Sequence, residues 1–248
     1  MHDLVPDSPL AEALPSPNHG PRGDRKPDSI ILHYTGMKTG AAALERLRDP
    51  ASEVSAHYVV EEDGRIFQLV PEARRAWHAG RSAWAGETDM NSASIGVEIV
   101  NGGHDFGMPP FPDAQIEAVI ALCHDIVKRH GITMQRVLAH SDIAPGRKTD
   151  PGEKFPWARL AAAGVGHYVP PCPVGGDVGL RPGDEGAPVW DLQRKLVAYG
   201  YGLEVTGTYD EPTQAVVTAF QRHFRPALID GKADLSTIAT LQDLLAAD

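Results

Sequence analysis

The sequence has only two cysteines in 248 residues, which excludes a small fold held together by several disulfides. Cys123 falls inside a predicted helix and Cys172 inside a proline-rich stretch, so we expect both to be free thiols. The absence of any Cys-x-x-Cys pair also disfavours a zinc site built from thiolates. A metal in this chain would therefore need nitrogen and oxygen ligands.

The chain also has no excess of positive charge and no long apolar run. Its formal net charge is −10, which disfavours nucleic acid or an anionic membrane surface as the main partner. No apolar run reaches the roughly 18 residues that suggest a membrane-spanning helix, so we expect no membrane insertion. Residues 1–10 contain neither the basic nor the apolar segment of a secretory signal. We therefore expect a cytoplasmic location, with the periplasm or envelope as the alternative if the native start lies elsewhere.

What the chain does contain is the composition of a globular protein, with 42% hydrophobic and 23% charged residues. Its length exceeds that of an ordinary single domain and favours two unequal domains. The expected parts are an extended proline-rich arm (1–27), a large domain (28–168), a linker (169–180) and a small domain (181–248).

The large domain alternates β-branched, apolar runs with amphipathic segments. Asp63-Gly64 between two such runs predicts a hairpin, because this pair tolerates the positive φ of a tight turn. These features predict an α/β fold with a central mixed β-sheet flanked by helices. Residues 75–91, rich in tryptophan and glycine, predict an irregular loop that forms a groove wall. The expected strands are 29–33, 55–60, 65–70, 94–100 and 136–140, and the expected helices are 41–48, 112–130 and 157–163.

Three residues with donor atoms for a metal lie at or near predicted strand ends. His140 ends one strand, and Asp150 follows in turn-forming sequence. A catalytic zinc ion usually has three protein ligands, and His33 at the end of strand 29–33 is the best third donor. Because a single histidine at a strand end is more often an ordinary polar residue, the prediction depends on the combination.

Two charged residues have open interpretations. Glu98 is a carboxylate inside the apolar strand 94–100, and glutamate is almost never fully buried unless it is paired. Its side chain therefore either points to a polar face of the sheet or takes part in catalysis. Lys148 lies two residues before Asp150 and is either a catalytic cation or an ordinary surface lysine.

Five segments together resemble the zinc-dependent N-acetylmuramoyl-L-alanine amidases of the AmpD/AmiD type, over roughly residues 28–163. The resemblance implies hydrolysis of the amide bond between the lactyl group of N-acetylmuramic acid and L-alanine of the peptidoglycan stem peptide. It implies peptidoglycan fragments or muropeptides as partners. The segments are IILHYTG (30–36), VSAHYVV (54–60), AWHAG (76–80), SIGVEIV (94–100) and HSDIAPGRKTDPG (140–152).

The resemblance also implies roles for the charged residues. One zinc ion per chain would be held by His33, His140 and Asp150 and would leave a fourth position for water. Glu98 would accept the proton of that water and pass it to the leaving amine. Lys148 would stabilise the oxyanion that develops on the scissile carbonyl.

By the same analogy, four residues are expected to line the substrate groove: His57, Trp77, His78 and Asn101. Two other classes of function compete with catalysis. A peptidoglycan-recognition protein uses the same fold to bind fragments without cutting them, but the complete set of expected catalytic residues favours an enzyme. A purely structural zinc site would need a fourth protein ligand, for which His78 is the one candidate.

The small domain has three apolar stripes at helical spacing, around residues 189–199, 216–224 and 235–245. The phrases VWDLQRKLVAYGY and TQAVVTAFQ resemble the three-helix peptidoglycan-binding module often appended to wall hydrolases. A unit of this size is marginally stable alone, so docking on the large domain would help it. The absence of a signal favours recycling of anhydro-muropeptides, whereas the appended module favours wall polymer, and the sequence leaves both open.

Overall fold

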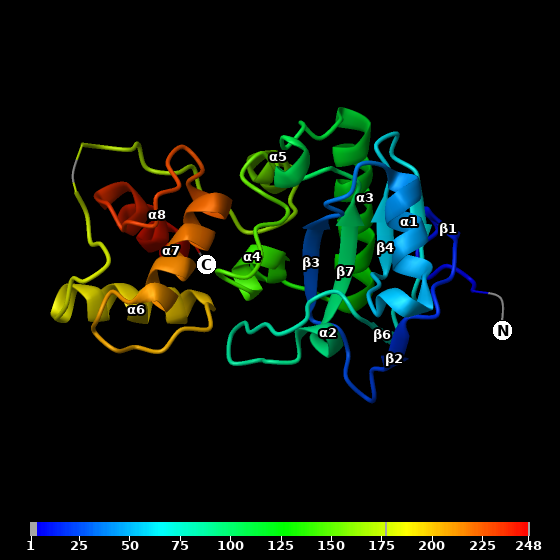
Figure 1. Cartoon of the computed structure of the whole chain (residues 1–248), viewed down its shortest axis with the longest axis horizontal. Coiled ribbons are helices and arrows are strands. Elements are labelled where there is room, and N and C mark those ends of the chain that lie inside the picture. Colours follow the sequence, from blue (N-terminus) through cyan, green and yellow to red (C-terminus); the bar gives the residue numbers. More distant parts are fainter. Residues whose placement is uncertain (1–3, 177, 248) are drawn as a thin grey trace.

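The computed structural model describes residues 4–176 and 178–247. Figure 1 shows an α/β unit and a three-helix unit side by side, with the N-terminus at the end far from the three helices. Both units have the predicted class: a mixed sheet flanked by helices, and a small all-α unit. Cys123 is buried and Cys172 is partly exposed, and both are free thiols as predicted.

Within the described residues, two sheets are formed by the strands β1 (Ala11–Ala13), β2 (His19–Pro21), β3 (Ser29–Tyr34), β4 (Tyr58–Val60), β5 (Ile66–Gln68), β6 (Arg74–Ala76), β7 (Ser94–Ile99) and β8 (Val137–Ala139). The larger sheet has the order β1-β5-β4-β7-β3-β8, and β2 pairs with β6 in the smaller one. In the larger sheet only the β4–β5 pair is antiparallel. The sheet is therefore mixed, as predicted.

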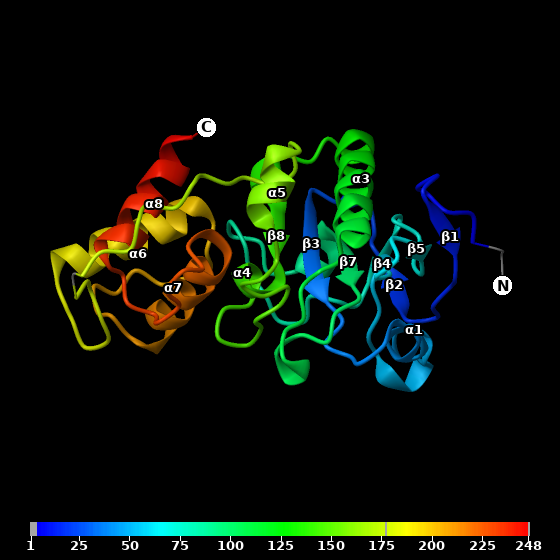
Figure 2. The same ribbon diagram turned by 90° about the horizontal axis from the view of Figure 1, so that it is seen from above.

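The helices of the larger unit are α1 (Gly40–Arg48), α2 (Met90–Ala93), α3 (Asp113–His130), α4 (His140–Ile143) and α5 (Trp157–Ala162), with short 3₁₀ turns η1 (Pro50–Ser52), η2 (His104–Phe106) and η3 (Met134–Arg136). The second unit consists of α6 (Ala187–Tyr199), α7 (Glu211–Phe224) and α8 (Leu235–Ala246). Figure 2 shows α3 on one face of the sheet and α1 on the other. None of the described helices is long and apolar enough to cross a membrane.

The predicted hairpin connects β4 and β5. Gly64 adopts a φ of +88°, and an added Cβ would lie 2.9 Å from the carbonyl oxygen of Ala114, so only glycine fits there. Of the predicted arm 1–27, the structure describes residues 4–27, and these are more ordered than predicted, because they contribute β1 to the large sheet and β2 to the small one. Their sequences, Ala-Glu-Ala and His-Gly-Pro, contain no β-branched residue, phenylalanine, tyrosine or tryptophan and are too short for any alternation to indicate a strand.

Alternate residues of β3 face two different hydrophobic cores. Ile30 and Leu32 pack with the residues of α3, whereas Ile31 packs on the opposite face. That second cluster also contains Tyr201 and Phe220 of the three-helix unit. The two units therefore share a continuous core.

Candidate active site

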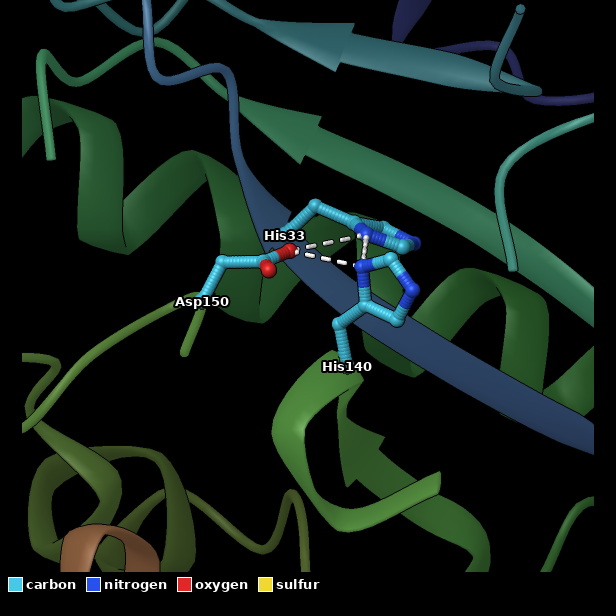
Figure 3. A group of neighbouring side chains, drawn as sticks. All are labelled: His33, His140 and Asp150. Carbon is cyan, nitrogen blue, oxygen red and sulfur yellow. Dashed lines mark hydrogen bonds and ion pairs between the residues drawn. The ribbon is translucent and has the colours of Figure 1, made fainter. Parts of the chain in front are cut away.

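Three elements bring the predicted metal ligands together. His33 lies near the end of β3 on the same face as Ile31, and His140 is the first residue of α4, directly after β8. The backbone N–H of Ser141 donates to the carbonyl oxygen of Asp150 at 3.0 Å, which fastens the two loop ligands to each other. Figure 3 shows the three side chains converging from these elements.

The ligand atoms form a nearly equilateral triangle. The Nδ1 atoms of His33 and His140 are 2.9 Å apart, and Oδ2 of Asp150 lies 3.0 Å from the first and 2.9 Å from the second. The side chains are at most 9% exposed. Two imidazole nitrogens and one carboxylate oxygen are a donor set that zinc accepts. Within the described residues, these three form the metal-binding cluster.

The outer nitrogens of both rings have partners that fix their protons. Nε2 of His140 lies 3.1 Å from the carbonyl oxygen of Ala79, an acceptor, so Nε2 carries the hydrogen and Nδ1 keeps its lone pair. Nε2 of His33 lies 3.0 Å from Nδ1 of His78, whose own Nε2 is 3.3 Å from Oγ of Ser94. The Ser94 hydroxyl donates to the carbonyl oxygen of Met90. This chain is satisfied when each Nε2 donates, so His33 also presents a lone pair at Nδ1.

Electrostatics favour the same forms. Burial, followed by the neighbouring His140, lowers the pKa of His33 to about 4. Burial alone would raise the pKa of Asp150, but His140 and His33 lower it well below its usual range. Near neutral pH His33 is therefore a neutral imidazole and Asp150 an ionised carboxylate. Three converging lone pairs of this kind fit a cation.

Glu98 is on β7 opposite His33 in the β3–β7 register. Its neighbour Val97 packs in the core beside α3, so Glu98 points to the other face. Its Oε2 atom is buried and has no hydrogen-bond partner. Burial, and then the charge of Asp150, raise the pKa of Glu98 well above its ordinary value. The two interpretations of Glu98 are therefore compatible. Its side chain points away from the core beside α3, and it points into the site.

A cavity of about 320 Å³ contains these groups. Glu98 and Lys148 line it together with the three ligand residues, and Trp77 and His78 form part of its wall. His78 contacts the outer nitrogen of His33, on the side of the ring away from the ligand triangle. It therefore supports a ligand instead of supplying a fourth one, which argues against a purely structural zinc site.

The structure corrects two predicted groove residues. His57 is completely buried: its Nδ1 accepts the backbone N–H of Gly96 at 2.9 Å, and its Nε2 is 2.8 Å from Nη2 of Arg22. Asn101 is also buried, where its side chain accepts the N–H of Gly103 and donates to the carbonyl oxygen of Pro109. Both fasten backbone segments beside the site, and neither lines the cavity.

Sequence reasoning missed Asp142, two residues after the ligand His140. Its buried carboxylate accepts the N–H of Ala139 at 2.8 Å and the hydroxyl of Tyr201 at 2.9 Å, and it pairs with Nδ1 of His223 at 2.7 Å. The helix α4 has only four residues and is too short to be stable alone. The second unit therefore helps to hold the helix that carries a metal ligand.

Comparison with known families shows that both units have relatives. Residues 23–153 match the family described as N-acetylmuramoyl-L-alanine amidase, and residues 185–241 match the family described as peptidoglycan binding domain. The chain is 40% identical over 228 residues to the N-acetylmuramoyl-L-alanine amidase AmiD of Escherichia coli, covering 87% of this chain and 81% of AmiD. It is 35% identical over 170 residues to the 1,6-anhydro-N-acetylmuramyl-L-alanine amidase AmpD of Enterobacter cloacae, covering 61% of this chain and 89% of AmpD.

Two solved structures are similar over both units. One is E. coli AmiD in complex with anhydro-N-acetylmuramic acid-L-Ala-D-γ-Glu-L-Lys, with a TM-score of 0.76 and 39% identity, covering 92% of this chain and 90% of that one. The other is AmpDh3 of Pseudomonas aeruginosa in complex with an anhydromuramic pentapeptide, with a TM-score of 0.73 and 32% identity, covering 98% of each chain.

Proposed function

The chain belongs to the N-acetylmuramoyl-L-alanine amidase family, and we propose that it uses one zinc ion to hydrolyse 1,6-anhydro-muropeptides. The bond cut is the amide between N-acetylmuramic acid and L-alanine of the stem peptide. One observation carries the proposal: the triangle of ligand atoms of His33, His140 and Asp150 shares a cavity with the unpaired carboxylate of Glu98. The anhydro form is supported by the ligands of the similar AmiD and AmpDh3 structures.

His33, His140 and Asp150 would hold the ion. A bound zinc ion supplies Lewis acidity to water and to the scissile carbonyl group. The donor set of two imidazole nitrogens and one carboxylate oxygen supports zinc, because catalytic zinc sites use these ligand types. The fixed Nε2 protons of both histidines keep the ligand rings oriented before substrate arrives.

Glu98 moves the proton in this proposal. Its carboxylate accepts a proton from the attacking water as the new C–O bond forms. It then delivers that proton to the alanine nitrogen as the C–N bond breaks, which releases a free amine and a lactyl carboxylic acid that loses its remaining proton to solvent. The raised pKa suits this role, because a desolvated carboxylate is a stronger base than an exposed one.

Lys148 supplies positive charge on the same cavity wall. Its ammonium group lowers the pKa of Glu98 through space, so the two groups interact electrostatically. When the carbonyl carbon becomes tetrahedral, the cation stabilises the negative oxygen. Trp77 offers an apolar, flat surface on the cavity wall for sugar or peptide.

The test is mass analysis of muropeptides with an anhydro or a reducing sugar end, incubated with the protein with and without chelator. We expect free stem peptide from the anhydro form and none after chelation, and elemental analysis should find zinc. Release from the reducing form alone would refute the anhydro assignment. Binding of either form without any release would support the recognition-protein alternative instead.

A further inference from the structure

The three-helix unit is fixed relative to the active site. The backbone N–H of Ala85 donates to the carbonyl oxygen of Gly200 at 2.7 Å, and an added Cβ at Gly200 would lie 2.5 Å from the ring of Trp84. Tyr201 and the α7 residue His223 both bond to Asp142 of α4. Figure 1 shows α7 as the helix of this unit that faces α4. The polar surface of α7 is therefore held at a set position beside the catalytic loop.

A hollow of about 290 Å³ lies between this helix and the loop. Lys148 and Thr149 line it from the catalytic unit, and both also line the active-site cavity, so the two spaces adjoin. An added Cβ at Gly146 would lie 3.2 Å from Cβ of Ala215, which shows how closely the loop approaches α7. The α7 side of the hollow consists of Glu211, Gln214, Ala215, Thr218 and Arg222.

The chemistry of the α7 side is polar and nearly balanced in charge. It offers an amide, a hydroxyl, one carboxylate and one guanidinium group. The guanidinium of Arg222 lies 3.7 Å from the carboxylate of Glu153, and its buried Nε has no hydrogen-bond partner. Mixed donors and acceptors with little net charge suit hydroxyl and acetamido groups better than carboxylates.

Lys148 also lines a second hollow, which has a different charge. Arg75 and Arg147 line it with Lys148, against the single carboxylate of Glu53. A stem peptide carries carboxylates, whereas a glycan of N-acetylated sugars is uncharged. The more cationic hollow therefore matches the peptide side of the scissile amide. The hollow beside α7, where Lys148 and Arg222 accompany the carboxylate of Glu211, has less net charge and matches the sugar side.

We propose that the hollow between α7 and the loop of Lys148 and Thr149 is a glycan subsite, which binds sugar residues attached to the muramic acid that is being processed. The inference rests on the proposed function and adds a substrate feature to it: the three-helix unit contributes part of the substrate-binding surface at the catalytic centre. Substrates that carry further sugars should then bind more tightly than a single muramic acid with the same peptide.

Three substrates test the subsite: anhydromuramoyl tripeptide, the same compound extended by one N-acetylglucosamine, and the corresponding tetrasaccharide. The variants are Gln214→Ala, which removes an amide, and Gln214→Trp, which fills the hollow. Gln242→Ala is the matched control, because Gln242 is exposed on α8 and does not line the hollow. Thermal unfolding of each variant checks that it is folded.

The wild type should have a lower KM for the extended substrates than for the single-sugar one. Gln214→Ala should raise the extended-substrate KM by about 2- to 10-fold, the value of one lost neutral hydrogen bond, with kcat and the single-sugar KM unchanged. Equal KM values of the wild type for all three substrates, or equal effects of both alanine variants, would overturn the inference.

Calorimetry with the peptide-free tetrasaccharide separates this inference from the proposed function. Weaker binding by Gln214→Ala than by the wild type supports the subsite even if no peptide is released from any substrate. Peptide release with no detectable saccharide binding by the wild type leaves the amidase function intact and removes the subsite.

Discussion

Glu98 and His33 are register partners on adjacent parallel strands, so the carboxylate and the ligand ring leave the same face of the sheet. This pairing places an unpaired, desolvated carboxylate beside the metal-binding triangle without any loop having to position it. A site built on strands is more precisely held than one built on loops. The predictions below follow from this pairing and from the contacts that support it.

Replacing Glu98 with Gln should lower kcat by about 10²- to 10⁴-fold, because the amide cannot accept the proton of the attacking water. Metal content should not change, since Glu98 is not part of the ligand triangle. Turnover of the anhydro-muropeptide and elemental analysis measure the two quantities. Wild-type turnover in Glu98→Gln would show that another group is the base.

Replacing His78 with Ala should weaken metal binding by about 10- to 100-fold, because His33 loses the partner that orients its ring. Titration with a competing chelator measures the dissociation constant. Trp77→Ala is the control: it alters the same cavity wall without touching a ligand, so it should raise KM and leave metal affinity unchanged. Equal metal affinity in His78→Ala and the wild type would remove His78 from the support of the ligand.

Replacing Tyr201 with Phe should lower the free energy of unfolding by about 1.5–3 kcal/mol, the usual value of a hydrogen bond to a charged group. The variant leaves the buried carboxylate of Asp142 short of one donor. Denaturant titration measures the change, and Tyr168→Phe, which removes a hydroxyl from a half-buried ring, is the control. A change no larger than that of the control would mean that the contact between the units contributes little.

His57 gives a prediction about pH. Burial, and then the charge of Arg22, lower its pKa to about 3 in the folded state. The unfolded chain has the ordinary value near 6.5 and binds the proton first, so this residue makes the protein less stable as pH falls from about 6.5. His57→Asn removes that contribution, and its stability deficit against the wild type should narrow between pH 7 and pH 4. A deficit that stays constant over this range would contradict the assignment of His57 as a buried, neutral residue.

The two histidine ligands could be predicted from the sequence because His33 lies near the end of β3 and His140 directly follows β8, and these two parallel strands end at the same edge of the sheet. Asp150 lies in the turn-forming sequence after α4 and was predicted from its closeness to His140 in the chain. The direction in which a side chain points is harder to predict from the sequence. His57 and Asn101 lie in segments beside the site, but whether each side chain enters the cavity depends on packing that spacing does not reveal. The strands β1 and β2 were missed because their pairing is a tertiary contact without a hydrophobic pattern.

The docking of the two units was the least predictable feature. The partners of Asp142 lie 59 and 81 residues further along the chain, and no local pattern connects them. The three helices themselves were predicted, because apolar stripes at helical spacing indicate them directly. The cytoplasmic location stays a prediction, which fractionation of the native cells would test.

Titration of the metal-free protein with zinc, followed by the rate of stem-peptide release, tests the central claim most directly. We expect no release before addition, a linear rise up to one equivalent per chain and a plateau beyond it. His33→Ala should not recover activity at one equivalent, because one corner of the triangle is gone. Full activity in the metal-free protein, or undiminished activity in His33→Ala, would contradict a single catalytic zinc ion held by His33, His140 and Asp150.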